Sequence, residues 1–259
     1  VEGPGGRVHV PRRLRHRVNP PEPAPVDLVL AGAELVATLD EERAEIPGGW
    51  VALDDGRVAA VGAPGDEPPA AATLDARGCL VTPGLVNTHH HLYQNLTRAF
   101  APALRGDLFH WLQTLYPRWS LIDEESVYVS TWIGLAELAL GGCTTTSDHL
   151  YVHPRGAGDL ISAEVAAATD VGLRFHATRG SMSLSEKDGG LPPDSVVQDD
   201  DEILADSERL VHRHHDPSPE AMVQVALAPC SPFSVTRDLM VRTAELAERL
   251  DVRLHTHLA

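Results

Sequence analysis

Cysteines and long apolar runs are scarce in this chain of 259 residues. The three cysteines, Cys79, Cys143 and Cys230, are far apart and form no C-x-x-C pair. This argues against a disulfide framework and indicates reduced thiols in a cytoplasmic protein. No apolar run approaches the roughly 18 residues that a membrane helix needs. Basic residues number 21 against 37 acidic ones, a formal net charge of −16, so neither nucleic acid nor an anionic membrane is an expected partner.

The remaining composition is that of a globular protein. Apolar residues make up 43% of the chain and charged residues 22%, enough for a substantial core in one large domain or a domain with a smaller module. The 14 histidines are a high count and raise the expectation of metal or proton chemistry. Residues 1–25 are rich in Arg and Pro and lack the apolar stretch of a secretory signal. We expect a disordered tail there, or an artefact from sequence upstream of the true start.

Residues 26–82 carry short stretches of β-branched residues in near alternation, separated by turns. The sequence Asp54-Asp55-Gly56 is typical of a hairpin turn. We therefore expect a small β module of about four strands.

After Pro83 the pattern changes to alternating strands and helices. Strands are expected at 84–88, 143–148, 173–178, 222–228 and 252–257, and helices near 124–142, 159–171, 199–215 and 236–250. A long connection with several aromatic residues follows the first strand, and Ser120 or Asp123 is expected to cap the first helix. This alternation predicts an α/β fold with a parallel sheet or barrel and helices outside. Polar segments follow all five strands, at the end where such barrels form their active sites.

Three consecutive histidines follow the first expected strand. Alternate side chains of a strand share a face, so His89 and His91 project together while His90 points away. Their Cα atoms would lie roughly 6.6 Å apart at about 3.3 Å per residue, and two imidazoles can close that span onto one ion. This spacing favours metal ligation over a packed core histidine. His255 and His257 share a face in the same way after the fifth strand, and either could complete the site.

Other polar clusters have simpler explanations. Segment 212–215 (His-Arg-His-His) is expected to be a solvated helix end, and the acidic run 199–202 a helix start stabilised by the macrodipole. Asp148 and His149 are expected at the barrel mouth, in a supporting or a substrate-contacting role. Motifs of the types G-x-S-x-G, P-loop and H-E-x-x-H are absent. Cys230 lacks the second cysteine of the zinc nucleobase-deaminase signature.

The order of these features resembles the amidohydrolase superfamily: a β module, then PGLVNTHHH at 83–91, then strand–helix units. The resemblance implies the N-terminal strands of a composite β-sandwich over 26–82, and the first five βα units of a distorted (β/α)8 TIM barrel over 83–259. His89 and His91 match the superfamily's H-x-H. In the cyclic-amidine deaminase branch, the HTHLA segment implies His257 as a third ligand of one divalent ion, expected to be zinc. A proton-carrying glutamate would directly follow Ala259.

Finer motifs narrow the branch further. Guanine deaminases carry H-x-H-x-x-Q, whose glutamine reads the amide edge of the purine and matches Gln94. The segments RFHATRGSMSLSEKDGGLPPDSVV and APCSPFSV resemble bacterial 8-oxoguanine deaminases, with Cys230 where guanine deaminases have an arginine. The implied reaction converts 8-oxoguanine to urate and ammonia, with Gln94, Cys230 and Trp111 contacting the purine-like substrate. Aminohydrolases of guanine, pterins and hydroxytriazines share much of this pattern and stay open as alternatives.

The superfamily also has a histidine after strand six and an aspartate after strand eight, and these 259 residues supply neither. The resemblance therefore implies an N-terminal portion of an enzyme that is a homo-oligomer at full length. The 259-residue chain alone is expected to be inactive and prone to aggregate through its unpaired sheet edge. A non-enzymatic module that binds metal or a partner through the half-barrel is the alternative of another class.

Overall fold

The computed structural model describes residues 24–258. The chain divides between Pro83 and Gly84 into two compact units. The tail expected over 1–25 lies almost wholly outside the described residues. Within 24–258, no helix is both long enough and apolar enough to cross a membrane.

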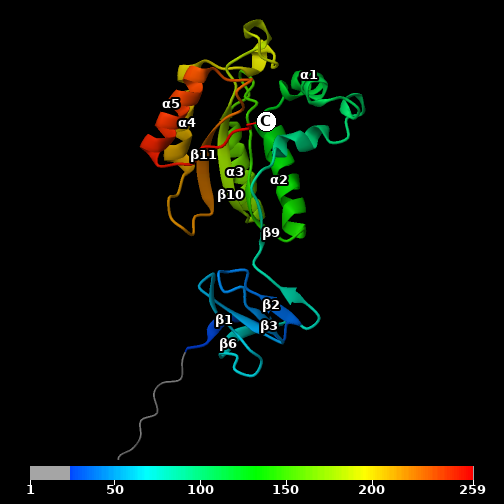
Figure 1. Ribbon diagram of the computed structural model, residues 1–259, viewed down its shortest axis with the longest axis vertical. Helices are drawn as coiled ribbons and strands as arrows, with labels where there is room; N and C mark the ends of the chain where they lie inside the picture. The colour runs from blue at the N-terminus through cyan, green and yellow to red at the C-terminus, as the bar shows by residue number, and fades with distance from the viewer. Residues whose placement is uncertain (1–23, 259) are drawn as a thin grey trace, which may run out of the picture. The chain divides into compact units, whose positions relative to one another are not determined.

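The first unit consists of short strands in two sheets (Figure 1, blue to cyan). One sheet has the order β5-β4-β1-β6 and the other the order β3-β2-β7. The strands are β1 Val26–Ala31, β2 Leu35–Ala37, β3 Glu45–Pro47, β4 Trp50–Asp54, β5 Arg57–Gly62, β6 Ala70–Asp75 and β7 Leu80–Val81. The described part holds more strands than the four expected, because three of them have only two or three residues and show no alternation in the sequence.

The hairpin expected at 54–56 is confirmed between β4 and β5, which pair antiparallel. Asp55 and Gly56 have φ values of 48° and 71°, the left-handed values that a two-residue turn between antiparallel strands needs. Val36 of β2 and Val51 of β4 belong to one buried cluster, so apolar side chains from both sheets share a core.

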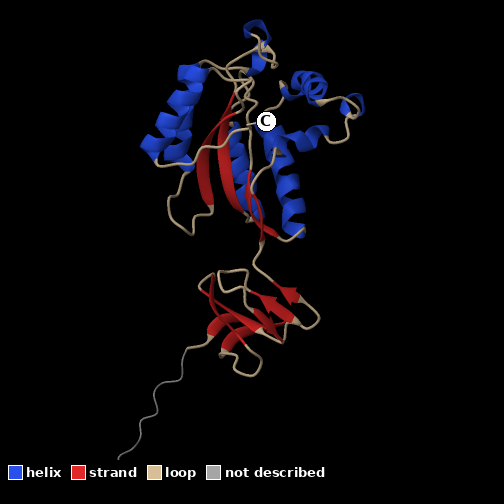
Figure 2. Cartoon of the chain, in the orientation of Figure 1, coloured by secondary structure: helices blue, strands red, loops and turns tan. Residues whose placement is uncertain are grey.

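The second unit is a parallel sheet with helices packed against it (Figure 2). Its strands, in spatial order, are β8 Leu85–Asn87, β9 Cys143–Ser147, β10 Arg174–Ser181 and β11 Val223–Pro229. The helices between and after them are α2 Glu124–Leu140, α3 Leu160–Val171, α4 Asp200–His214 and α5 Arg237–Leu250. The expected alternation and the parallel pairing are confirmed. This is the arrangement of consecutive units in a TIM barrel.

The helix starts follow capping residues in the sequence. The Asp123 carboxylate accepts a hydrogen bond from the Ser126 amide, and the Asp123 amide donates to the Ser126 hydroxyl, which makes a capping box for α2. Asp199 caps α4 and Thr236 caps α5 in a similar way. Each cap satisfies an N–H that the first helical turn leaves unpaired. Asp123, and not Ser120, is therefore the cap of α2.

The long connection after β8 contains a helix that was not predicted from the sequence. This helix is α1 Leu108–Trp119, and the 3₁₀ turns η1 Leu92–Thr97 and η2 Ala101–Ala103 precede it. Asp107 caps α1 by accepting a hydrogen bond from the His110 amide. Two further 3₁₀ turns, η3 Glu186–Asp188 and η4 Asp194–Val196, lie between β10 and α4.

The fifth expected strand, 252–257, is shorter than predicted and is reduced to a single bridge between Leu227 and Leu254. The parallel ladder begins regularly. The Leu227 amide donates to the Arg253 carbonyl at 3.0 Å, and the His255 amide donates to the Leu227 carbonyl at 2.9 Å.

The next amide of β11 in this ladder belongs to Pro229, which has no N–H to donate to the His255 carbonyl. The ladder therefore breaks at this position. The His257 amide donates to the Cys230 carbonyl instead, at 3.1 Å. The shortened strand thus follows from one missing hydrogen-bond donor.

Candidate metal centre and active site

Four histidines from separate segments come together beyond the carboxyl ends of the strands. The possible ligand nitrogens of His89, His91, His149 and His257 all lie within 4.8 Å of one another. His89 and His91 follow β8, His149 follows β9, and His257 lies in the segment that pairs with β11. This is the end of a parallel barrel where a site is expected.

Three of the ring nitrogens form a compact triangle. The Nε2 atom of His89 lies 3.2 Å from that of His91 and 3.3 Å from that of His257, and the last two are 3.2 Å apart. Two ligands of a tetrahedral zinc ion, each at about 2.0–2.1 Å from the metal, are separated by about 3.3–3.4 Å. The triangle therefore has the size of one face of a zinc coordination tetrahedron.

Backbone carbonyls hold the second ring nitrogen of two of these histidines. His91 Nδ1 donates to the His149 carbonyl at 2.7 Å, and His257 Nδ1 donates to the Cys230 carbonyl at 2.8 Å. A neutral imidazole has one N–H, so the Nε2 atoms of His91 and His257 both present lone pairs to each other. Two lone pairs at 3.2 Å cannot form a hydrogen bond and are stabilised by a cation between them. The donor set fits a divalent ion such as zinc.

Burial keeps the imidazoles of His91 and His149 neutral. Desolvation lowers the pKa of His91 to about 3 and that of His149 to about 2, and it also lowers the pKa of His89. Neighbouring imidazoles add to the effect in each case. A metal binds the neutral form of imidazole, so the rings of His91 and His149 are in the form that a ligand needs at pH 7.

The other histidines near the site take different places. His255 Nε2 lies 2.9 Å from Nδ1 of His89. His255 therefore supports the His89 ring at the nitrogen that is not part of the triangle. His90 is outside the cluster, and its carbonyl accepts from the His149 amide at 2.7 Å. His149 was expected in a supporting or substrate-contacting role, and the structure brings it into the cluster. Its Nε2 lies 3.4 Å from the Ala228 carbonyl.

Segments 199–202 and 212–215 lie at the two ends of α4. The acidic residues 200–202 form the first turn, and the basic residues 212–214 form the last. His214 Nε2 lies 2.7 Å from the Ser162 hydroxyl, and no residue of either segment belongs to the described histidine cluster. Both segments therefore have helix-end positions.

A cavity of about 400 Å³ adjoins the triangle. His91 and His257 line it, and so do Gln94, Trp111 and Cys230. The structure thus brings the three expected substrate-binding residues to the same cavity as two of the three expected metal ligands. The lining also includes residues that were not predicted as site residues from the sequence, among them Phe109, Tyr116, Tyr151, Ser231, Phe233 and Ser234.

The unpredicted helix α1 supplies much of the apolar wall of this cavity. Leu108, Trp111, Leu112 and Tyr116 all line it, and their spacing of three, one and four residues places them on one face of a helix. That spacing was the signal in the sequence from which both the helix and the wall could have been found.

Gln94 and Cys230 present different chemistry to the cavity. Gln94 Nε2 donates to the Tyr93 hydroxyl at 3.3 Å, which leaves the amide oxygen for another partner. Burial raises the pKa of the Cys230 thiol to about 11, so the thiol is neutral at pH 7. Cys230 therefore offers a small neutral group to a ligand, while its carbonyl holds His257.

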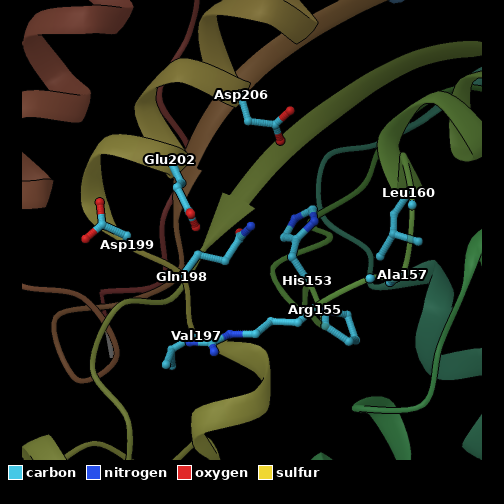
Figure 3. A pocket seen from close by; sticks show the side chains of 12 residues that line it. His153, Arg155, Ala157, Leu160, Val197, Gln198, Asp199, Glu202 and Asp206 are labelled. Atoms are coloured by element: carbon cyan, nitrogen blue, oxygen red, sulfur yellow. The ribbon is translucent and has the colours of Figure 1, made fainter.

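A second cavity, of about 520 Å³, lies between the β9–α3 loop and the start of α4 (Figure 3). His153, Arg155, Glu202 and Asp206 lie around it, and none of the four clustered histidines lines it. Asp206 is already paired at 2.8 Å with the buried guanidinium of Arg179. This cavity is therefore separate from the metal centre.

Comparison with known proteins decides the family. The protein-family model described as "Amidohydrolase family" matches residues 80–259 of the sequence. The chain belongs to the amidohydrolase family. This confirms the expected superfamily and its α/β fold with a partial TIM barrel.

Two curated relatives and one solved structure show how far the similarity of this amidohydrolase extends. It is 52% identical over 213 residues to 8-oxoguanine deaminase from Pseudomonas aeruginosa, covering 82% of this chain and 47% of that protein. It is 44% identical over 188 residues to hydroxydechloroatrazine ethylaminohydrolase from Pseudomonas sp. (strain ADP), covering 71% and 39%. Atrazine chlorohydrolase TrzN from Arthrobacter aurescens TC1, complexed with zinc, matches with a TM-score of 0.85 at 32% identity, covering 90% of this chain and 53% of that one. The chain spans less than half the length of the two curated relatives.

Proposed function

We propose that this amidohydrolase is a metal-dependent aminohydrolase that converts 8-oxoguanine to urate and ammonia. The observation that carries the proposal is the triangle of Nε2 atoms beside a cavity lined by Gln94, Trp111 and Cys230. The 52% identity to 8-oxoguanine deaminase supports the choice of an oxidised purine. A cavity of about 400 Å³ falls in the range of small-molecule sites.

His89, His91 and His257 would hold one divalent ion. The zinc in the TrzN structure supports zinc as that ion. When bound, it supplies the Lewis acidity that makes water a nucleophile at neutral pH. The carbonyls of His149 and Cys230 would keep the rings of His91 and His257 in the metal-binding tautomer.

The residues around the cavity would orient the substrate ring. Trp111 and Phe109 supply aromatic surface, on which a planar purine can stack. The amide oxygen of Gln94 can accept a hydrogen bond from a ring N–H. Cys230 leaves room where the guanine deaminases that this chain resembles have an arginine. Together these groups favour a flat, nitrogen-rich heterocycle.

Hydrolysis forms a C–O bond at the amino-bearing ring carbon, breaks the C–N bond and requires a proton on the leaving nitrogen. None of the described residues that line the cavity is a carboxylate. The proton carrier therefore stays a prediction from the resemblance, which implies a glutamate directly after Ala259.

A hydroxytriazine is the second candidate substrate, because the chain is 44% identical to hydroxydechloroatrazine ethylaminohydrolase. A pterin is a further alternative, supported by 35% identity over 223 residues to isoxanthopterin deaminase, and guanine is an alternative on the resemblance alone. A non-enzymatic metal-binding or partner-binding protein is the alternative of another class.

Turnover by the full polypeptide, loaded with zinc, tests the proposal. Ammonia release is measured with 8-oxoguanine, guanine, isoxanthopterin and hydroxytriazines, and urate is expected from 8-oxoguanine. Turnover of a triazine alone would show the substrate assignment to be wrong and leave the hydrolytic chemistry standing. Zinc binding without turnover of any of these compounds would favour the non-enzymatic alternative.

A further inference from the structure

Two consecutive residues after β9 clamp the segment that carries His91. The His149 amide donates to the His90 carbonyl at 2.7 Å, and His91 Nδ1 donates to the His149 carbonyl at 2.7 Å. The Leu92 amide donates to Asp148 Oδ1 at 2.6 Å. The ring of His91 and the peptide that follows it are therefore both held from the β9 side.

Asp148 is fully buried, and among the described residues only one of its carboxyl oxygens has a hydrogen-bond donor. Its side chain is 0% exposed, and Oδ2 has no hydrogen-bond donor among residues 24–258. Glu164 of α3 is also 0% exposed, and neither of its carboxyl oxygens has a donor in the described part of the chain. The carboxyl groups of Asp148 and Glu164 contact each other. Three buried carboxyl oxygen atoms therefore lack a donor in the described part of the chain, unless one of them carries a proton.

Two adjacent carboxyl groups in a buried site cannot both be ionised. Burial, together with the charge of Asp148, raises the pKa of Glu164 well above its usual value. Asp148 Oδ1 accepts a hydrogen bond from the Leu92 amide, which stabilises a carboxylate, whereas neither oxygen of Glu164 has a donor among the described residues. The charge is therefore better placed on Asp148 and the proton on Glu164. A protonated carboxyl group is the donor that Asp148 Oδ2 otherwise lacks.

We infer that Glu164 is a positioning residue that stays protonated and donates its O–H to Asp148, which in turn fixes the His91 segment of the metal centre. The connection runs from the Glu164 O–H to Asp148 Oδ2, and from Asp148 Oδ1 to the Leu92 amide next to His91. The proton shared by Glu164 and Asp148 does not depend on the proposed function. The effect of this proton on metal binding rests on the proposed function.

Three variants of the full polypeptide separate the roles of donor and packing. Glu164→Gln keeps a donor, whereas Glu164→Met keeps a similar length without one. Thr243→Val removes another buried hydroxyl without a described partner, on α5, and serves as the matched control. By competition with a chelator, Glu164→Met should weaken zinc binding about 10- to 100-fold, the effect of losing a group that supports a ligand. Glu164→Gln and Thr243→Val should stay within about twofold of the parent.

Equal zinc affinity for Glu164→Met and the parent would overturn the inference. So would an equal loss in Glu164→Gln and Glu164→Met, because the donor would then not be what matters. If the parent itself bound no zinc, the proposed function would fail instead. Infrared spectroscopy tests the proton directly, even if Glu164→Met does not fold. The carbonyl stretch of a protonated carboxylic acid should be present in the parent at neutral pH and lost in Glu164→Gln, and its absence from the parent would also overturn the inference.

Discussion

Alanine in place of His257, His255 or His90 should separate a metal ligand from a supporting residue and from a bystander. His257 Nε2 lies 3.3 Å from Nε2 of His89 and 3.2 Å from that of His91, the spacing of ligands on one ion. His255 reaches only the second nitrogen of His89, at 2.9 Å. His90 takes no part in the cluster of ring nitrogens. The loss of metal affinity should therefore be largest for the variant at His257, smaller for that at His255 and smallest for that at His90.

The size of each effect follows from the position of the ring. A four-ligand zinc site binds with about 10–16 kcal/mol, so one ligand contributes about 2.5–4 kcal/mol and His257→Ala should weaken binding by ~100- to ~1000-fold. His255→Ala removes a group that orients a ligand, which costs about 10- to 100-fold. His90→Ala should change the affinity by less than about twofold.

Metal affinity is measured on each variant by competition with a chromophoric chelator, after circular dichroism has shown that the variant is folded. The expected order of loss is His257→Ala, then His255→Ala, then His90→Ala. A loss in His255→Ala as large as that in His257→Ala would refute the assignment of the triangle as the metal centre. So would a loss of more than about tenfold in His90→Ala, since that ring would then be a ligand or its support.

Three further outcomes concern stability and substrate binding. Burial lowers the pKa of His176 to about 4, so the unfolded chain takes up this proton first, and stability is lost as the pH falls from about 6.5 toward 4. The free energy of unfolding, measured with urea, should therefore fall by about 2–3 kcal/mol less in His176→Asn than in the parent between pH 7 and pH 4.5. An unchanged pH dependence would contradict this. Asp123→Ala should lower the free energy of unfolding by about 1 kcal/mol through loss of the capping box, while Ser120→Ala has little effect; equal effects would contradict the cap assignment. Gln94→Ala should lower kcat/KM for the purine about 10- to 100-fold at unchanged zinc affinity, and an unchanged kcat/KM would exclude Gln94 from substrate binding.

The alternation of strands and helices was predictable because its signals are local. Helices expected at 159–171 and 236–250 are observed at Leu160–Val171 and Arg237–Leu250. Their starts are marked by side chains that satisfy the first amides: Asp159 and Thr236 act as the caps. A cap and an apolar period lie within a few residues of each other, so no distant contact is needed to recognise them.

Helix α1 was missed although its apolar spacing is helical. Pro117 lies in its last turn, and a proline inside a pattern normally argues against a helix because it lacks an N–H and crowds the preceding turn. Burial of Leu115, Tyr116 and Trp119 outweighs that local cost through tertiary packing. Such packing against the rest of the unit cannot be seen in a local window of sequence.

The candidate site was only partly predictable for a related reason. The pairing of His89 with His91 follows from the period of a strand, which is local. The approach of His149 depends on β8 and β9 being neighbours in the sheet, and the sequence gives no register for that pairing. The choice of His257 over His255 came from a resemblance, because the strand period treats the two alike. The observed contacts distinguish them. His257 Nε2 is one corner of the triangle, whereas His255 Nε2 lies beside Nδ1 of His89.

The missing amide proton of Pro229 connects the break in the fold with the orientation of this third histidine. A regular parallel ladder would bring the His257 amide to the carbonyl of residue 229. Because Pro229 cannot donate to the His255 carbonyl, the ladder shifts, and the Cys230 carbonyl accepts both the backbone amide of His257 and its ring Nδ1–H. With Nδ1 held in this way, Nε2 keeps its lone pair and lies beside Nε2 of His89 and His91. The irregularity that shortens the fifth strand is therefore the same one that turns the third nitrogen toward the metal centre.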